Sequence, residues 1–99
     1  MTGSRSADAR TPAVPRWIAT EQTLGRRVSR GIVLSGGPGR FDLVLHPGDV
    51  VWPLFAEPRT LDEIVDALGD AGVEPGHARE YAASLIDDLV GRDLLRPVA

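Results

Sequence analysis

The order of elements in the second half of the chain constrains its fold most strongly. An apolar strand is expected over Phe41–Leu45, and Pro47-Gly48 then leads into three successive helical segments that end near Gly91. A strand followed directly by three helices in so short a stretch is typical of a small winged-helix-like unit. The sequence therefore predicts an α+β domain in which a three-stranded antiparallel sheet packs on three helices.

The first half of the chain predicts the rest of the sheet. Trp17–Ala19 is an isolated apolar patch that fits either a first strand or a cover on the core. Arg27–Leu34 is rich in β-branched residues and is interpreted as one strand. Ser35–Gly39 combines glycines with proline and is predicted to be the turn before the next strand. On that next strand alternate residues share one face, here Phe41, Leu43 and Leu45.

The first helix is expected to be short. Its predicted range is Asp49–Ala56, and Pro53 lies inside it. Proline lacks a backbone N–H, so it costs little in the first turn of a helix and disrupts any later turn. The start of this helix therefore decides whether it is regular or kinked.

The second helix has the clearest local signals. Thr60 and Glu63 form a capping box, in which each side chain can accept a hydrogen bond from the backbone N–H of the other residue. The helix is predicted over Leu61–Leu68, and either Gly69 or Gly72 is expected to end it. Its apolar positions follow at i, i+3, i+4 and i+7 and are Leu61, Ile64, Val65 and Leu68.

The third helix opens at Glu74-Pro75-Gly76 and runs to about Gly91. Its apolar residues cover an arc of roughly 180°, whereas a single core-facing stripe needs only about 100°. Tyr81 borders one edge of the arc, and Ile86 and Val90 border the other. Either the domain wraps this helix deeply or one edge lines a groove, and the pattern leaves both open. The residues at the centre of the arc, expected in the core, are Ala78, Ala82, Leu85 and Leu89.

Charge is divided unevenly between the two halves of the chain. Residues 1–46 hold seven arginines against three acidic residues, and residues 47–99 hold four arginines against eleven acidic residues. Affinity for nucleic acid depends mainly on cations that meet phosphates. The acidic second half, which contains the last helix, therefore argues against a nucleic-acid partner.

Composition and the N-terminus indicate a cytoplasmic protein. There is no cysteine, which excludes disulfides and cysteine-ligated metal and fits a reducing compartment. No apolar run reaches the ~18 residues of a membrane span, so no membrane partner is expected. Residues 1–15 are rich in Gly, Ser, Arg, Thr and Pro and are predicted to be a disordered tail without the apolar core of a secretory signal.

No set of residues indicates catalysis, a cofactor or a metal site. His46 and His77 lie far apart in sequence and have no cysteine or helical histidine beside them. Gly36–Arg40 lacks the Gly-Lys-Ser/Thr of a phosphate loop and precedes a strand, so a hairpin turn is the better interpretation. No serine has an evident base and orienting partner. The chain is therefore predicted not to be an enzyme.

Residues from about Arg27 to Arg96 resemble the PqqD-like family. These domains, also called RiPP recognition elements, recognise peptides in the biosynthesis of ribosomally made, post-translationally modified peptides. The block from Arg59 to Ile64 and the ending from Gly91 to Leu95 are weak alone, and their order and spacing make the resemblance more specific. Pro47-Gly48-Asp49 at the entry to the first helix, Pro53 inside it and Glu57 after it depart from the family pattern. The blocks that carry the resemblance are Phe41–Asp49, Val51–Phe55, Glu57–Ile64 and Leu85–Arg96.

The resemblance implies that residues 16–99 form a PqqD-like domain without an active site. Such domains bind the leader segment of a precursor peptide in the cleft between the third strand and the third helix. An edge strand has unpaired N–H and C=O groups, which an added strand satisfies with little dependence on side chains. The implied partners are the leader peptide and the modifying enzyme or leader protease that receives it. The matching positions here are Phe41, Asp42, Leu43, Val44 and Leu45 on the strand and Tyr81, Leu85, Asp88 and Leu89 on the helix.

Two other functions stay open. A winged-helix DNA-binding regulator would place the third helix in the major groove. However, the polar side of that helix carries Glu80, Asp87 and Asp88 against Arg79 and Arg92. A scaffold subunit of a maturation enzyme would co-purify with that enzyme and would bind no precursor peptide.

Overall fold

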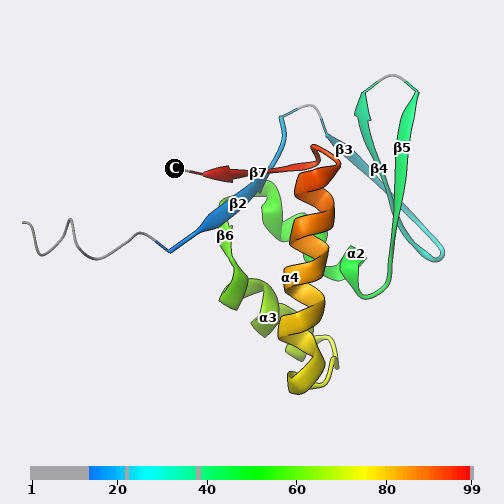
Figure 1. Ribbon diagram of the computed structural model, residues 1–99. Coiled ribbons are helices and arrows are strands. Elements are labelled where there is room, and N and C mark those ends of the chain that lie inside the picture. Colours follow the sequence, from blue (N-terminus) through cyan, green and yellow to red (C-terminus); the bar gives the residue numbers. More distant parts are fainter. Residues whose placement is uncertain (1–13, 22, 38, 99) are drawn as a thin grey trace, which may run out of the picture.

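Two small antiparallel sheets, each of three strands, and a set of helices make up the α+β fold within residues 14–21, 23–37 and 39–98, which the computed structural model describes (Figure 1). The predicted α+β fold is thereby confirmed. In chain order the elements are β2 (Arg16–Ala19), β3 (Leu24–Val28), β4 (Gly31–Gly37), β5 (Arg40–Leu45), α2 (Gly48–Val51), the 3₁₀ helix η1 (Trp52–Ala56), β6 (Arg59–Thr60), α3 (Leu61–Asp70), α4 (Pro75–Gly91) and β7 (Leu95–Val98).

Strands β3, β4 and β5 form one antiparallel sheet in that order. The prediction of a single strand over Arg27–Leu34 is wrong, because a turn at Ser29 and Arg30 divides it and Val28 pairs with Gly31. Enrichment in β-branched residues marks extended backbone but does not locate a reversal, and Gly31, which directly follows this turn, lay inside the predicted strand. The predicted turn over Ser35–Gly39 is also shorter than expected, since β4 continues to Gly37.

Strand β2 confirms the interpretation of Trp17–Ala19 as a strand and places it in a second sheet. Its neighbours are β6 on one side and β7 on the other, and both pair with it antiparallel. Ala19 pairs with Leu95, so the two ends of the described chain lie side by side (Figure 1). Strand β7, which the sequence did not predict, completes this sheet.

The segment predicted as one helix over Asp49–Ala56 is divided into two short helices. An α-helical turn, α2, begins at Gly48, one residue earlier than expected, and η1 follows it directly. Pro53 lies in the first turn of η1, where its missing N–H removes no hydrogen bond. The tighter 3₁₀ turn thus accommodates the proline while Trp52 and Phe55 stay buried.

Helix α3 has the predicted capping box. The backbone N–H of Glu63 donates to Thr60 Oγ1 at 3.2 Å, and the backbone N–H of Thr60 donates to Glu63 Oε1 at 2.8 Å. The helix continues past Gly69 to Asp70, and Gly72 follows with a positive φ of 96°. Of the two glycines offered by the sequence, Gly72 is therefore the one at the helix end.

The capping box makes a testable contribution to the pH dependence of stability. The backbone N–H of Thr60 stabilises the Glu63 carboxylate and is the main cause that lowers the pKa of Glu63 below its ordinary value of 4.5. A lowered pKa in the folded state gives stability that is present above 4.5 and is lost as the pH falls through the folded value. The substitution Glu63→Gln keeps an acceptor but does not titrate. Urea unfolding of both proteins should show wild type more stable near neutral pH and the difference shrinking in acid; a constant difference would contradict this.

The core lies between the inner face of the β3–β4–β5 sheet, α2 with η1, α3 and α4. On α4 the prediction of Leu85 at the centre of the buried stripe is wrong, since Leu85 is half-buried and Ile86 is only 2% exposed. The stripe is rotated toward Ile86 because α4 packs on α3 and β7. The buried cluster comprises Ile32, Leu34, Val44, Val51, Trp52, Phe55, Ile64, Leu68, Ala78, Ala82, Ile86, Leu89, Leu94 and Leu95.

Two further expectations concern the N-terminus and membranes. The tail predicted over residues 1–15 lies, except for Val14 and Pro15, outside the described residues. Within the part of the chain that is described, no helix is both long enough and apolar enough to span a lipid bilayer.

Candidate functional site

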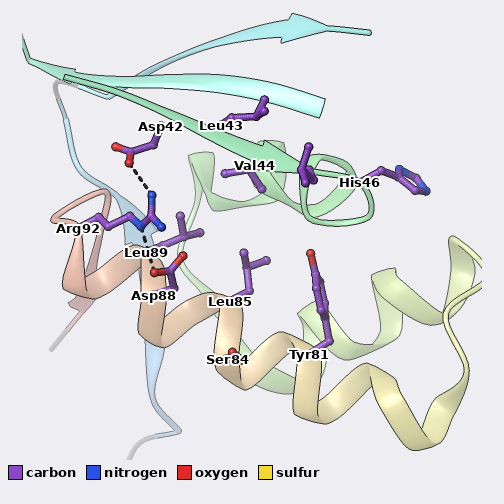
Figure 2. Close-up of a pocket in the computed structure, with 11 residues that line it drawn as sticks. Asp42, Leu43, Val44, His46, Tyr81, Ser84, Leu85, Asp88, Leu89 and Arg92 are labelled. Atoms are coloured by element: carbon purple, nitrogen blue, oxygen red, sulfur yellow. Dashed lines mark hydrogen bonds and ion pairs between the residues drawn. The ribbon is translucent and has the colours of Figure 1, made fainter. Parts of the chain in front are cut away.

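A groove with a volume of about 530 Å³ lies between β5 and α4. Figure 2 shows the strand along one wall and the helix along the other. The helix residues recur every three or four positions, which places them on one side of α4. The strand wall is lined by Asp42, Leu43, Val44, Leu45 and His46, and the helix wall by Tyr81, Ser84, Leu85, Asp88, Leu89 and Arg92.

The structure brings together every site residue expected from the sequence except Phe41, which is 71% exposed and does not line the groove. Three lining residues were missed by the sequence analysis. Ser84 and Arg92 continue the helical spacing of the expected residues, so the periodicity of α4 contains the signal for both. His46 directly follows the strand.

The strand wall of the groove is an open sheet edge. The backbone N–H of His46 donates to the carbonyl of Arg30 on the β4 side at 3.4 Å. In an antiparallel ladder, alternate residues bond to the same neighbour, so Val44 also bonds to β4 through its partner Ile32. The N–H and C=O groups of Leu43 and Leu45 therefore point away from β4. No strand among the described residues pairs with this edge.

Side chains on β5 alternate between the groove and the opposite face of the sheet. Val44 is 8% exposed and points toward α4, whereas Leu43 is 47% exposed and points away from the helix (Figure 2). Leu85 and Leu89 complete an apolar floor from the helix side. The groove thus combines free main-chain groups on its rim with an apolar floor.

One end of the groove is bridged by charged side chains. Arg92 Nη1 donates to Asp42 Oδ1 at 2.6 Å, and Arg92 Nε donates to Asp88 Oδ1 at 3.0 Å (Figure 2). The hydrogen bond to Asp42 is the main cause that raises the pKa of Arg92, and the hydrogen bond to Asp88 raises it further. Arg40 Nη2 also donates to the carbonyl of Arg92 at 2.7 Å. Two arginines and two carboxylates balance in charge and join β5 to α4, which fixes the width of the groove at this end.

The other end of the groove is set by Tyr81 and the turn after β5. Burial is the main cause that raises the pKa of the Tyr81 phenol. A Cβ on Gly48 would lie 2.9 Å from the Tyr81 hydroxyl and 2.6 Å from Val44 Cγ1, so any larger residue would force these side chains to move. The buried Asp49 carboxylate holds the turn through His46 Nδ1 at 3.0 Å and Arg27 Nη1 at 3.1 Å.

Comparison with known proteins adds no family assignment. No family model matches the sequence, and no curated protein matches it. The resemblance to the PqqD-like family therefore stays a prediction that depends on the sequence blocks alone.

Proposed function

We propose that this protein is a non-catalytic peptide-binding chaperone of the PqqD-like kind. It captures the leader segment of a ribosomally synthesised precursor peptide and presents it to a modifying enzyme or leader protease. The observation that carries the proposal is the open edge of β5, whose Leu43 and Leu45 main-chain groups border an apolar groove against α4.

The proposed mechanism is strand addition. An extended leader lies along β5 and exchanges main-chain hydrogen bonds with Leu43 and Leu45. Because side chains alternate along a strand, every second leader residue points into the groove toward Val44 and Leu85. The main-chain bonds supply much of the affinity, and the groove selects apolar side chains at alternate positions.

The chemistry of the groove favours binding over bond breaking. Its floor is aliphatic, and its carboxylates Asp42 and Asp88 are held by Arg92. We therefore assign no catalytic residue, cofactor or metal to the activity. We place it in the cytoplasm, where ribosomal precursor peptides are made.

The electrostatics of α4 disfavour the DNA-binding alternative. Arg79 pairs with Asp62 of α3, and Arg92 pairs with Asp42 and Asp88. The arginine of α4 and the one at its C-cap are thus already neutralised within the domain, and the remaining exposed charges of the helix are acidic. Contacts with phosphates supply most of the affinity of a DNA-binding helix, and α4 has no unengaged arginine to make them.

A calorimetric titration with the leader of the precursor encoded beside the gene tests this function. The full-length protein should bind that leader with an affinity in the micromolar range or tighter. Leu85→Asp should weaken binding about 30-fold, or about 2 kcal/mol, because it places an unpaired carboxylate on the apolar floor. Ala83→Asp adds the same charge on the opposite side of α4 and should have little effect. Absence of binding by wild type at tens of micromolar peptide would overturn the proposal.

A further inference from the structure

The face of the β3–β4–β5 sheet that points away from the helices is apolar and exposed. The register places alternate residues of the three strands on this outer face, and the opposite residues Ile32, Leu34 and Val44 fill the core. Leu24 and Phe41 are 73% and 71% exposed. The apolar side chains of the outer face are Leu24, Val28, Val33, Phe41, Leu43 and Leu45.

Neither the fold nor the groove accounts for this outer face. An antiparallel sheet with one solvated side ordinarily alternates apolar residues inward with polar residues outward. Here both sides of the sheet are apolar, and the groove uses only the edge of β5 and its inner side. A contiguous exposed apolar patch on a small domain marks an interaction surface.

The one charged side chain that the register places on the outer face of the strands is a cation. Arg26 lies on the face in the middle of β3, opposite Val33, and Arg30 lies in the turn that follows β3. Neither arginine has an ion-pair partner among the described residues. Asp42, the acidic residue of β5, points to the other side of the sheet and is held by Arg92 (Figure 2). On their outer face the described strands thus present apolar side chains, Ser35 and one cation, Arg26, and no carboxylate.

We propose that the outer face is a second interaction surface, which docks a protein partner whose apolar patch is bordered by carboxylates. Such a partner would cover the leucines and Phe41 and would pair with Arg26. A second copy of this chain fits less well, because two outer faces would bring arginines together without an acidic residue between them. An anionic membrane also fits less well, since residues 47–99 carry eleven acidic residues against four arginines.

This surface is separable from the groove. Strand β3 is the opposite edge of the sheet from β5, with β4 between them. Changes at Leu24 and Arg26 therefore leave the open edge of β5 intact. Binding of a partner to the outer face can therefore be tested independently of what binds in the groove.

Site-specific photocrosslinking in the organism that makes the protein tests this proposal. The full chain carries benzoylphenylalanine in place of Leu24, and a control carries it in place of Asp66, which is exposed on α3. We expect one protein, other than this chain, to be crosslinked from position 24 and not from position 66. Crosslinks between two copies of this chain, or no protein adduct at position 24, would overturn the proposal.

Charge reversal then tests the chemistry of the captured partner. Arg26→Glu should weaken binding of the purified partner about tenfold or more, since a rim charge that meets carboxylates becomes repulsive. Arg96→Glu makes the same charge change on β7, in the other sheet, and should have little effect. Equal affinities for Arg26→Glu and wild type would overturn the proposal, as would binding of wild type to phosphatidylglycerol vesicles that Arg26→Glu abolishes. Leader affinity should be unchanged by Arg26→Glu, so the groove is judged separately.

Discussion

Replacing Leu43 by proline is expected to weaken leader binding severely while the domain stays folded. The N–H of Leu43 points to the open edge of β5, and proline removes this donor and puts a ring carbon where the added strand would lie. The bond between Val44 and β4 is retained, and proline is tolerated where an edge strand faces solvent. Calorimetry with the leader should show an affinity at least about 30-fold weaker, or about 2 kcal/mol.

The matched control for this substitution is Leu43→Ala. Alanine keeps the main-chain donor and removes only a side chain that points away from the groove. Leader affinity should therefore stay close to that of wild type, and circular dichroism should show both variants folded. Equal loss of affinity in the alanine and proline variants would mean that the side chain, rather than the strand edge, holds the peptide.

Replacing Gly31 by alanine is expected to destabilise the protein severely. A Cβ at this position would lie 2.0 Å from the carbonyl oxygen of Val44 and 2.9 Å from its carbonyl carbon. Both atoms belong to the backbone of β5, so the clash cannot be relieved by rotation of a side chain. The two strands would have to separate at the edge of the core, which should lower the free energy of unfolding by about 3 kcal/mol.

Urea unfolding of Gly31→Ala and Gly69→Ala measures this effect against a control. Gly69 lies inside α3 and has no atom within 4 Å of an added Cβ. Alanine there should stabilise the protein by up to about 1 kcal/mol, because glycine is a poor helix former. A Gly31→Ala protein within about 1 kcal/mol of wild type would show that β4 and β5 do not need this close approach.

The parts of the fold that the sequence predicts well depend on contacts between neighbouring residues. The capping box of Thr60 and Glu63 requires only one turn of helix, and α3 begins where it was expected. The second sheet depends instead on pairing between Ala19 and Leu95, at opposite ends of the domain. No local pattern specifies that contact, so β7, whose four residues include the charged Arg96 and Pro97, was missed.

The position of the groove between β5 and α4 was expected from the family resemblance, but the side of β5 that faces it was not. A one-residue change of register exchanges the two sides of a strand, and the sequence alone could not decide between them. Phe41, Leu43 and Leu45 do share a face, as expected, but it is the outer face, and Val44 faces the helix. On α4 the apolar pattern left both edges open, and only the family resemblance pointed to Tyr81. The bridge made by Arg92 needs the strand beside it.

Amide hydrogen exchange of the labelled full-length protein, followed by NMR with and without the leader of the neighbouring precursor, tests strand addition most directly. The amides of Leu43 and Leu45 should exchange rapidly in the free protein and become at least about tenfold more protected with saturating leader. The amides of Val44 and His46 should be protected in both states, and shifts should extend along α4 from Tyr81 to Leu89. Leader binding that leaves Leu43 and Leu45 unprotected would contradict strand addition, and no change at saturating leader would contradict peptide binding altogether.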